Sequence, residues 1–313
     1  MKPPVIVLAG PTAVGKTELS LRLAEALDAE IVSADSMQVY RGMDIGTAKA
    51  SPSERARVPH HMIDVADPSE NFSIARYVSL ARETVRGIHS RGKIPLIVGG
   101  TGFYIQALLK DLDFSEKTED SPLRDKYRRT AETEGAEALH RRLKDVDPAS
   151  AAAIHPNNIK RVIRALEYFE ETGKPISFLN EAQGEQESPY RVLYLVLDLP
   201  RAELYRRIEK RVDRMMEEGL EEETERLLSQ GIPADATAMQ SIGYKELAGS
   251  LRGSCTKEEA IRQIKLASRH YAKRQVTWFK REKEAVWIQK TDYPGEEILL
   301  QHLLDLCRQF LHE

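Results

Sequence analysis

A glycine-rich segment near the start of the sequence has the composition and spacing of a phosphate-binding loop. Gly10-Pro-Thr-Ala-Val-Gly-Lys-Thr17 fits the template G-x-x-x-x-G-K-[ST] and directly follows an apolar run, residues 5–9. The backbone N–H groups of such a loop point at one anion, and the positive end of the next helix faces it too. Lys16 would reach the outer phosphates and the Thr17 hydroxyl would bind Mg²⁺. We therefore predict a site for at least a diphosphate, formed by Gly10, Pro11, Thr12, Ala13, Val14, Gly15, Lys16 and Thr17.

A polar loop follows the second predicted strand, residues 30–34. Asp35 begins this loop, where its carboxylate could bind Mg²⁺, cap a helix or act as a general base. The carboxyl ends of strands in an open α/β sheet line the ligand crevice, so we expect Asp35 beside the phosphate loop. The loop from Asp35 to Lys49 is longer and richer in polar side chains than a structural connection needs, which favours a functional role.

A second glycine-rich segment, Gly99-Gly-Thr-Gly102, follows a third predicted strand, residues 94–98. Glycines let the backbone approach a ligand closely, and Thr101 would place its hydroxyl in the same crevice. A tight turn from strand to helix, with Thr101 as the helix N-cap, explains the segment equally well.

Arg211 interrupts the apolar face of a helix predicted at residues 201–218. It lies between three apolar residues that share a narrow arc of that helix: Leu204, Ile208 and Met215. The pattern predicts that Arg211 points toward the core, where an unpaired guanidinium is very costly. It therefore needs an anion. A structural carboxylate would serve, but a phosphate in the crevice is favoured because a guanidinium binds it bidentately.

The helix predicted at residues 256–283 is amphipathic, and its polar side is almost wholly basic. The apolar face carries Ile261, Ile264, Tyr271, Trp278 and Phe279. The polar face carries Arg262, Lys265, Arg269, Lys273 and Lys280. A solvated charged face is the common explanation of such a stripe. Here no acid stands among the basic residues of that face before Glu282 and the chain as a whole is acidic, which favours a surface that binds a polyanion.

Bulk composition narrows the class of protein only slightly. The chain has 313 residues, 30% of them charged, and a formal net charge of −3, so it has no global attraction for polyanions. Cys255 and Cys307 show neither metal-site spacing nor a disulfide framework, which suits a reducing compartment. Residues 1–10 lack the features of a signal peptide, and no apolar run has transmembrane length. We expect a cytoplasmic monomer without membrane contact.

The order of the predicted elements indicates an α/β fold. Strands at residues 5–9, 30–34 and 94–98 alternate with helices at 15–27, 73–91 and 103–109. Continuous apolar strands between helices are typical of a parallel sheet covered on both faces. With the phosphate loop after the first strand, this predicts a P-loop NTPase-like parallel sheet core.

The pattern changes near Asp111. A polar linker at residues 111–122 leads into a segment with only helical periodicity, whose clearest helix is residues 158–172. Another polar stretch, residues 181–189, precedes a strand at 192–197. We predict a catalytic core of residues 1–113 and 190–313, with a helical insertion domain at 114–189. The rest of the core is predicted to hold helices at 201–218, 221–230, 244–250, 256–283 and 295–312, and a short apolar run at 285–288.

Six segments together resemble the bacterial tRNA dimethylallyltransferases, or isopentenyl-tRNA transferases. They are residues 10–17, 35–49, 60–64 (His60-His-Met-Ile-Asp64), 99–104, 161–167 (Arg161-Val-Ile-Arg-Ala-Leu-Glu167) and 271–279. The similarity runs in order over nearly the whole chain, and the segment from Asp35 to Lys49 is highly specific to that family. Two departures, Ala50 for the usual proline and Phe103 for the more usual leucine, touch none of the expected chemistry.

The resemblance implies transfer of a dimethylallyl group from dimethylallyl diphosphate to N6 of the adenosine just 3′ of the anticodon in tRNA, with release of diphosphate. The P-loop would then bind the diphosphate, with Lys16, Thr17 and Mg²⁺. Asp35 would accept the N6 proton as general base. Thr101 would hold the diphosphate or its bridging oxygen, and Arg211 would neutralise the departing pyrophosphate.

The resemblance also implies where tRNA is bound. Ser36, Met37 and Gln38 would contact the target base and its neighbours, and a stacked adenosine must be flipped out to reach them. The insertion, with Arg124 near the flipped nucleotide, and the basic helix would grip the anticodon stem-loop. We therefore predict tRNA contacts by Asp35, Ser36, Met37, Gln38, Thr101, Arg124, Lys160, Arg161, Arg164, Arg269, Lys273 and Arg274.

Two other functions fit part of the residue pattern. A P-loop small-molecule kinase would bind ATP in the same loop, but it leaves the basic helix and the loop from Asp35 to Lys49 without a role. A regulatory RNA-binding NTPase would explain the basic helix. It also predicts a Walker-B carboxylate after an apolar strand, where Gly99 and Gly100 stand instead.

Overall fold

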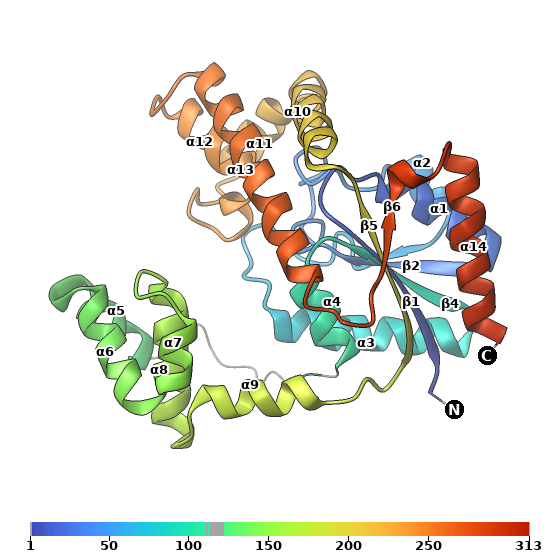
Figure 1. The fold of residues 1–313 in the computed structure, drawn as a ribbon. Coiled ribbons are helices and arrows are strands. Elements are labelled where there is room, and N and C mark those ends of the chain that lie inside the picture. Colours follow the sequence, from blue (N-terminus) through green and yellow to red (C-terminus); the bar gives the residue numbers. More distant parts are fainter. Residues whose placement is uncertain (1, 111, 113–121, 313) are drawn as a thin grey trace. The chain divides into compact units, whose positions relative to one another are not determined.

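The computed structural model of the chain describes residues 2–110, 112 and 122–312 (Figure 1). Most of the linker predicted at residues 111–122 lies outside the described residues. The chain splits into two compact units, residues 1–111 with 188–313, and residues 112–187. The insertion predicted from the sequence spans residues 114–189.

The first unit is built on a six-stranded, all-parallel sheet with the strand order β3-β2-β4-β1-β5-β6. The strands are β1 (Pro4–Ala9), β2 (Ala29–Ala34), β3 (His60–His61), β4 (Ile94–Gly99), β5 (Arg191–Asp198) and β6 (Val286–Gln289). Gly99 pairs with both Ala9 and Ala34, so β1, β4 and β2 end level with one another. The segments that follow these three strands therefore leave the sheet at one edge. The predicted α/β fold with a P-loop-like parallel sheet is confirmed.

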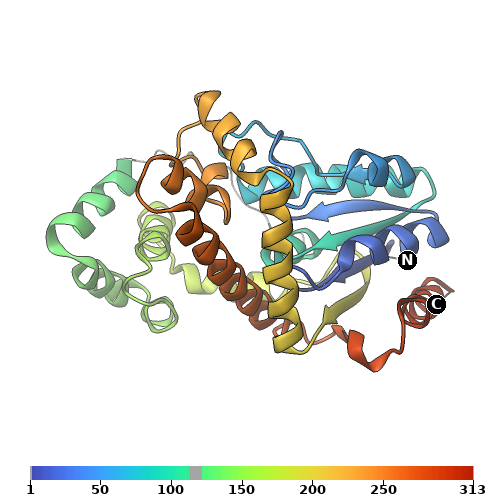
Figure 2. The same cartoon turned by 90° about the horizontal axis from the view of Figure 1, so that it is seen from above.

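Helices cover both faces of this sheet. Figures 1 and 2 show α1 (Lys16–Leu27) and α14 (Glu296–His312) on one face, and α3 (Ile74–Ser90) and α4 (Gly102–Leu109) on the other. Ile6 and Leu8 of β1 belong to one buried cluster with apolar residues of α1 and α14. Alternate residues of a strand face opposite sides, which is why a fully apolar strand is needed between two helical layers.

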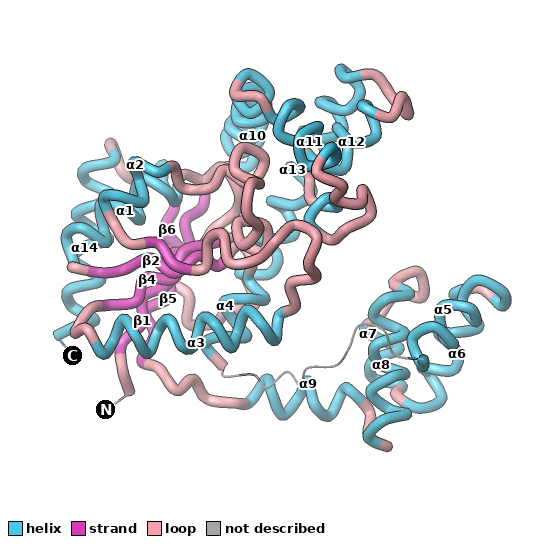
Figure 3. Tube along the Cα trace, turned by 180° about the vertical axis from the view of Figure 1, so that it is seen from behind, coloured by secondary structure: helices cyan, strands magenta, loops and turns pink. Residues whose placement is uncertain are grey.

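The second half of the first unit is mainly helical. It contains α10 (Arg201–Glu217), α11 (Leu220–Ser229), α12 (Tyr244–Leu251) and α13 (Lys257–Phe279), with two 3₁₀ turns, η1 (Ala238–Gln240) and η2 (Lys290–Asp292). The predicted elements are present, but α13 ends at Phe279 rather than at residue 283. A short helix, α2 (Pro52–Arg57), and the two-residue strand β3 escaped prediction because neither is long enough to show a hydrophobic period. Figure 3 shows the loops that follow the strands.

The second unit contains five helices in its described part: α5 (Pro122–Glu134), α6 (Ala136–Val146), α7 (Pro148–Ala153), α8 (Ile159–Thr172) and α9 (Ile176–Glu185). Its core is formed by Tyr127, Leu139, Leu143, Val162 and Leu166 with their neighbours. Gly173 ends α8 in a left-handed conformation, which glycine adopts without strain. The first half of the polar stretch at residues 181–189 is helical, because α9 continues through Glu185.

Candidate active site

The phosphate loop joins β1 to α1 with its lysine turned inward. Nζ of Lys16 donates hydrogen bonds to the carbonyl oxygens of Gly10 (2.8 Å) and Pro11 (2.9 Å). Burial, helped by the positive charge of Arg211, lowers the pKa of Lys16 to about 7, and the charge of Asp35 opposes this shift. Lys16, Arg211 and Asp35 therefore act on one another electrostatically. An anion bound in the loop would favour the charged form of Lys16.

The Asp35 carboxylate is held by its own loop. Its Oδ1 accepts the backbone N–H of Met37 (2.8 Å) and of Gln38 (3.3 Å). Its Oδ2 has no hydrogen-bond or ion-pair partner among the described residues. One oxygen thus fixes the orientation of the carboxylate, while the other is available to a ligand.

Thr101 lies next to this loop, and its hydroxyl does not cap α4. It occupies the N-cap position but makes no side-chain capping bond, and its Oγ1 accepts the backbone N–H of Ser36 (3.2 Å). Its own N–H donates to the carbonyl of Ala34 (3.1 Å). These bonds join the carboxyl ends of β2 and β4. Thr101 is thus the N-cap residue of α4, as the capping explanation holds, but its hydroxyl bonds to the loop instead of capping the helix.

The glycines around Thr101 make room for protein rather than for a ligand. A Cβ on Gly100 would lie 2.1 Å from Nε2 of Gln275, and one on Gly102 would lie 2.0 Å from Cδ1 of Trp278. Both distances are impossible for real atoms, so α13 packs directly on this turn only because the side chains are absent. The glycines were expected to let a ligand approach the backbone closely. In the structure it is α13 that approaches the backbone there.

Gln275 links the two glycine-rich segments, a role that was not predicted from the sequence. Its side chain is 5% exposed. Oε1 accepts the N–H of Thr12 (2.9 Å), and Nε2 donates to the carbonyl of Gly100 (2.9 Å). A signal was present, because Gln275 stands three and four residues from Ala272 and Phe279 on the buried face of α13. A buried amide on an apolar face needs partners in the same way that Arg211 does.

Arg211 has no structural carboxylate as a partner. It lies partly buried on α10, next to the buried Val212 and one turn from the buried Ile208. Among the described residues no Asp or Glu oxygen lies within 4.0 Å of its guanidinium. Burial lowers the pKa of Arg211, and the negative charge of Asp35 counteracts this. The described residues thus offer no carboxylate as the partner of Arg211, and an anion in the crevice stays the predicted one.

Two buried charged residues hold the loop from Asp35 to Lys49. The carboxylate of Glu223 accepts the backbone N–H groups of Asp44, Ile45 and Gly46 at 3.0–3.3 Å. Nζ of Lys49 donates to the carbonyl of Tyr40 (2.7 Å) and to carboxylates of Asp44 and Asp64 (2.7 and 2.6 Å). The buried position of Glu223 was not predicted, because it follows two other glutamates in α11 and such a run is typical of a solvent-exposed surface.

Gln38 is also held by the protein, which limits its predicted contact with a base. Its Oε1 accepts from Oγ of Ser33 (2.9 Å), and its Nε2 donates to the carbonyls of Thr47 (3.2 Å) and Ala48 (3.4 Å). Ser36 and Met37 are partly exposed beside it.

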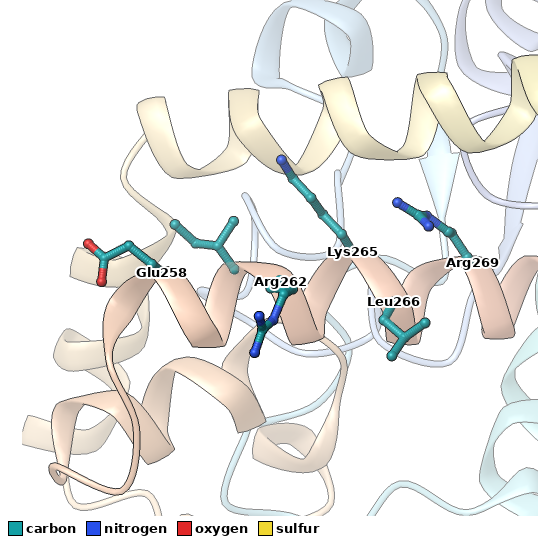
Figure 4. Close-up of a pocket in the computed structure, with 6 residues that line it drawn as sticks. Glu258, Arg262, Lys265, Leu266 and Arg269 are labelled. Atoms are coloured by element: carbon teal, nitrogen blue, oxygen red, sulfur yellow. The ribbon is translucent and has the colours of Figure 1, made fainter.

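The polar face of α13 is less free than the sequence predicted. Lys265 pairs with Asp213 (2.5 Å), Arg269 pairs with Glu209, and Arg262 pairs with Glu259. Figure 4 shows Lys265 and Arg269 reaching toward α10, beside a pocket also lined by Glu258, Ile261, Arg262 and Leu266. Lys265 and Arg269 are therefore only partly exposed, because α10 turns Asp213 and Glu209 toward them. Lys273, Arg274 and Lys280 are the exposed bases of this face without an ion pair in the described structure.

The predicted tRNA contacts of the insertion lie on two helices of the second unit. Arg124 of α5 forms a two-pronged ion pair with Glu167, whose side chain is 2% exposed, at 2.9 Å for Nη2 and 3.1 Å for Nε. Arg124 is therefore already committed inside its own unit. Lys160 and Arg161 are exposed and Arg164 is partly exposed on α8, and none has an ion pair within the described chain.

Within the described residues, no helix is both long enough and apolar enough to cross a membrane.

Comparison with known sequences identifies the family of the chain. A family model described as IPP transferase matches residues 38–282, and one described as isopentenyl transferase matches residues 3–65. A tRNA dimethylallyltransferase of Lachnoclostridium phytofermentans is 50% identical over 306 residues, which cover 98% of each chain. One from Bacillus cytotoxicus is 50% identical over 299 residues, covering 96% of this chain and 94% of the relative.

Solved structures agree as well. A tRNA isopentenylpyrophosphate transferase from Bacillus halodurans is 43% identical with a TM-score of 0.75, over 100% of this chain and 97% of that one. A eukaryotic dimethylallyltransferase solved while acting on tRNA is 30% identical with a TM-score of 0.84, over 99% of this chain and 80% of that one. The predicted resemblance is confirmed, and the chain belongs to the tRNA dimethylallyltransferase, or IPP transferase, family.

Proposed function

We propose that this enzyme transfers the dimethylallyl group of dimethylallyl diphosphate to N6 of the adenosine 3′-adjacent to the anticodon in tRNA. The observation that carries the proposal is the arrangement at one sheet edge. A phosphate loop with Lys16, an oriented carboxylate on Asp35, the hydroxyl of Thr101 and an Arg211 without a carboxylate partner belong to segments that meet there. The family membership of the chain supports the choice of tRNA as acceptor.

In the reaction, the bond between N6 and the allylic carbon forms as the bond from that carbon to the diphosphate oxygen breaks. Oδ2 of Asp35 takes the N6 proton, while Oδ1 stays bonded to the amides of Met37 and Gln38. The loop amides, Lys16 and Arg211 receive the negative charge that develops on the leaving diphosphate. Thr101, fixed by the Ser36 amide, would hold the diphosphate near the reacting carbon.

The residues present suit Mg²⁺ better than a transition metal. No group of three His, Cys, Asp or Glu side chains in the described part of the chain could hold a metal ion. Mg²⁺ needs only one or two protein oxygens when substrate phosphates supply others, and the exposed Thr17 offers a hydroxyl in the first turn of α1. Mg²⁺ on Thr17 would add positive charge at the diphosphate oxygens.

We propose that the exposed bases outside the core of the site hold the anticodon stem-loop by its phosphates. Lys273 and Arg274 on α13, and Lys160, Arg161 and Arg164 on α8, have no ion pair to break before binding a phosphate. Arg124, Arg269 and Gln38, in contrast, would have to exchange an internal contact for one with tRNA. We therefore expect these three residues to contribute less to tRNA affinity than the exposed bases do.

The proposal is tested by mixing enzyme, Mg²⁺, radiolabelled dimethylallyl diphosphate and an anticodon stem-loop RNA. Label should enter the RNA, and replacement of the target adenosine by guanosine should abolish it. A stem-loop that stays unlabelled under conditions where the donor binds would refute the proposal. Transfer of the terminal phosphate of ATP to a small metabolite would support a kinase instead.

A further inference from the structure

Lys290 is a buried lysine whose ammonium group has no hydrogen-bond partner. Its side chain is 6% exposed, and Nζ lacks a hydrogen bond within the described structure. Nζ forms an ion pair with the carboxylate of Glu296, but at 3.6 Å this contact is longer than a hydrogen bond. Glu296 is itself 63% exposed, so water competes for it. A buried cation whose ion pair is this long and solvent-exposed is only weakly compensated, so a further anion would stabilise it.

This ammonium group faces the phosphate loop. Lys290 follows β6 directly, at the sheet edge that also carries the loop. A Cβ built on Gly15 would lie 2.9 Å from Nζ of Lys290 and 3.8 Å from Nη1 of Arg207. Gly15 immediately precedes the first residue of α1, so both cations stand at the N-terminus of a twelve-residue helix. That end of a helix is the one that binds phosphate.

Arg207 is oriented by a neighbour on its own helix. Its Nε and Nη2 bind the carboxylate of Glu203 at 3.1 and 2.8 Å, while Nη1 is the nitrogen nearest to Gly15. One edge of the guanidinium is thus held, and another nitrogen is presented toward the loop. Burial and the proximity of Arg207 both lower the pKa of Lys290, and Glu296 and Glu203 oppose this.

We propose that Lys290 and Arg207 form a second cationic wall of the phosphate site, which binds phosphoryl oxygens of the diphosphate from the side of Gly15. Lys16 and Arg211 bind the same ligand from the side of Asp35. The inference rests on the proposed function for the choice of diphosphate as ligand. It adds two residues that no motif in the sequence marks. Lys290 comes from a 3₁₀ turn near the end of the chain, and Arg207 comes from α10.

The test measures pyrophosphate binding by calorimetry, with Mg²⁺ and without RNA, so that it does not depend on activity. Lys290→Met removes the charge and keeps the length, and should weaken pyrophosphate binding about ten-fold, as expected for a charge-assisted hydrogen bond. Lys290→Arg should retain most of the affinity. Lys93→Met is the matched control, because Lys93 precedes β4 at the opposite edge of the sheet and pairs with Asp28 (2.9 Å). It should leave pyrophosphate binding unchanged.

Thermal unfolding of the ligand-free variants separates binding from structure. If Lys290 awaits an anion, Lys290→Met should leave the Tm of the ligand-free protein unchanged or raise it. A fall of more than about 4 °C would show that Lys290 serves the fold and would overturn the inference. Unchanged pyrophosphate affinity in Lys290→Met would also overturn it. Should that variant fail to fold, Arg207→Gln carries the same expectation for pyrophosphate.

The two proposals can fail separately. Wild-type enzyme that binds pyrophosphate through Lys290 but never labels RNA would refute the proposed function and leave the second cationic wall standing. If RNA is labelled but Lys290→Met binds pyrophosphate with normal affinity, the proposed function stands and the second cationic wall is refuted.

Discussion

The side chain of Gln275 accepts a hydrogen bond from the backbone N–H of Thr12 at 2.9 Å, across 263 positions of the sequence. Its other end donates to the carbonyl of Gly100, so a single amide on α13 sets the phosphate loop against the turn that carries Thr101. The helix that was predicted to bind RNA is thus also the support of the diphosphate site.

Replacement of Gln275 should therefore affect both stability and donor binding. Gln275→Leu leaves two backbone groups without partners in a buried position, and we expect a loss of about 2–4 kcal/mol in the free energy of unfolding. Pyrophosphate binding should weaken at the same time, because the loop loses its support. Denaturant unfolding and calorimetry measure the two effects. Gln263→Leu, an exposed change on the same helix, is the control, and an equal effect there would contradict the prediction.

Asp35→Asn tests the general base without disturbing the loop. Asparagine keeps an oxygen that can accept the amides of Met37 and Gln38, so fold and RNA affinity should persist. It cannot accept the N6 proton, and single-turnover rates should fall by roughly 10²–10⁴-fold. A near-normal rate would leave Asp35 as a structural residue of the loop.

Arg211→Gln separates an anion-binding residue from a structural one. No carboxylate pairs with Arg211 in the described structure, so the ligand-free variant should stay within about 1 kcal/mol of the wild-type stability. Turnover should fall strongly, and inhibition by pyrophosphate should weaken in parallel. A loss of about 3–5 kcal/mol would instead be the mark of a broken buried ion pair, and would remove Arg211 from the mechanism.

The exposed bases of α13 should determine how RNA binding responds to salt. Replacing Lys273, Arg274 and Lys280 together by Gln should lower the slope of log affinity against log salt by roughly one for each RNA phosphate that the variant no longer binds. Lys265→Gln with Arg269→Gln should change that slope less, because these side chains are already paired with Asp213 and Glu209. Filter binding over a salt series compares the two variants, and the opposite ranking would contradict this assignment of the RNA-binding surface.

Pyrophosphate binding should weaken as pH rises above 7. The pKa of Lys16 is about 7 in the ligand-free protein, and a bound anion stabilises its charged form. Binding above that pH must then take up a proton, and the affinity falls by at most about ten-fold per pH unit. The ligand-free protein itself should gain stability between about pH 7 and the unfolded pKa of 10.5, where only the unfolded state keeps the proton. Calorimetry at several pH values measures the decrease in pyrophosphate affinity. The part of that decrease that is due to Lys16 should be absent in Lys16→Met.

The sequence alone determined the parts of this protein whose chemistry is local. A phosphate loop is recognisable because its glycines, lysine and threonine act from adjacent positions on a single anion. The parallel sheet follows from apolar runs that must be covered on both faces. Arg211 could be predicted to point inward because it interrupts the regular spacing of apolar residues on one face of its helix.

The tertiary structure alone decided which side chains meet. Periodicity shows that Lys265 and Arg269 share a face, but only the packing of α10 against α13 shows that this face meets acids. Gln275 and Lys290 act on backbone far away in the sequence, so no spacing rule reveals them. The physical reason is that a side chain's partner lies on another element, and the free energy of burying a charge or an amide depends on that partner rather than on its own neighbours along the chain.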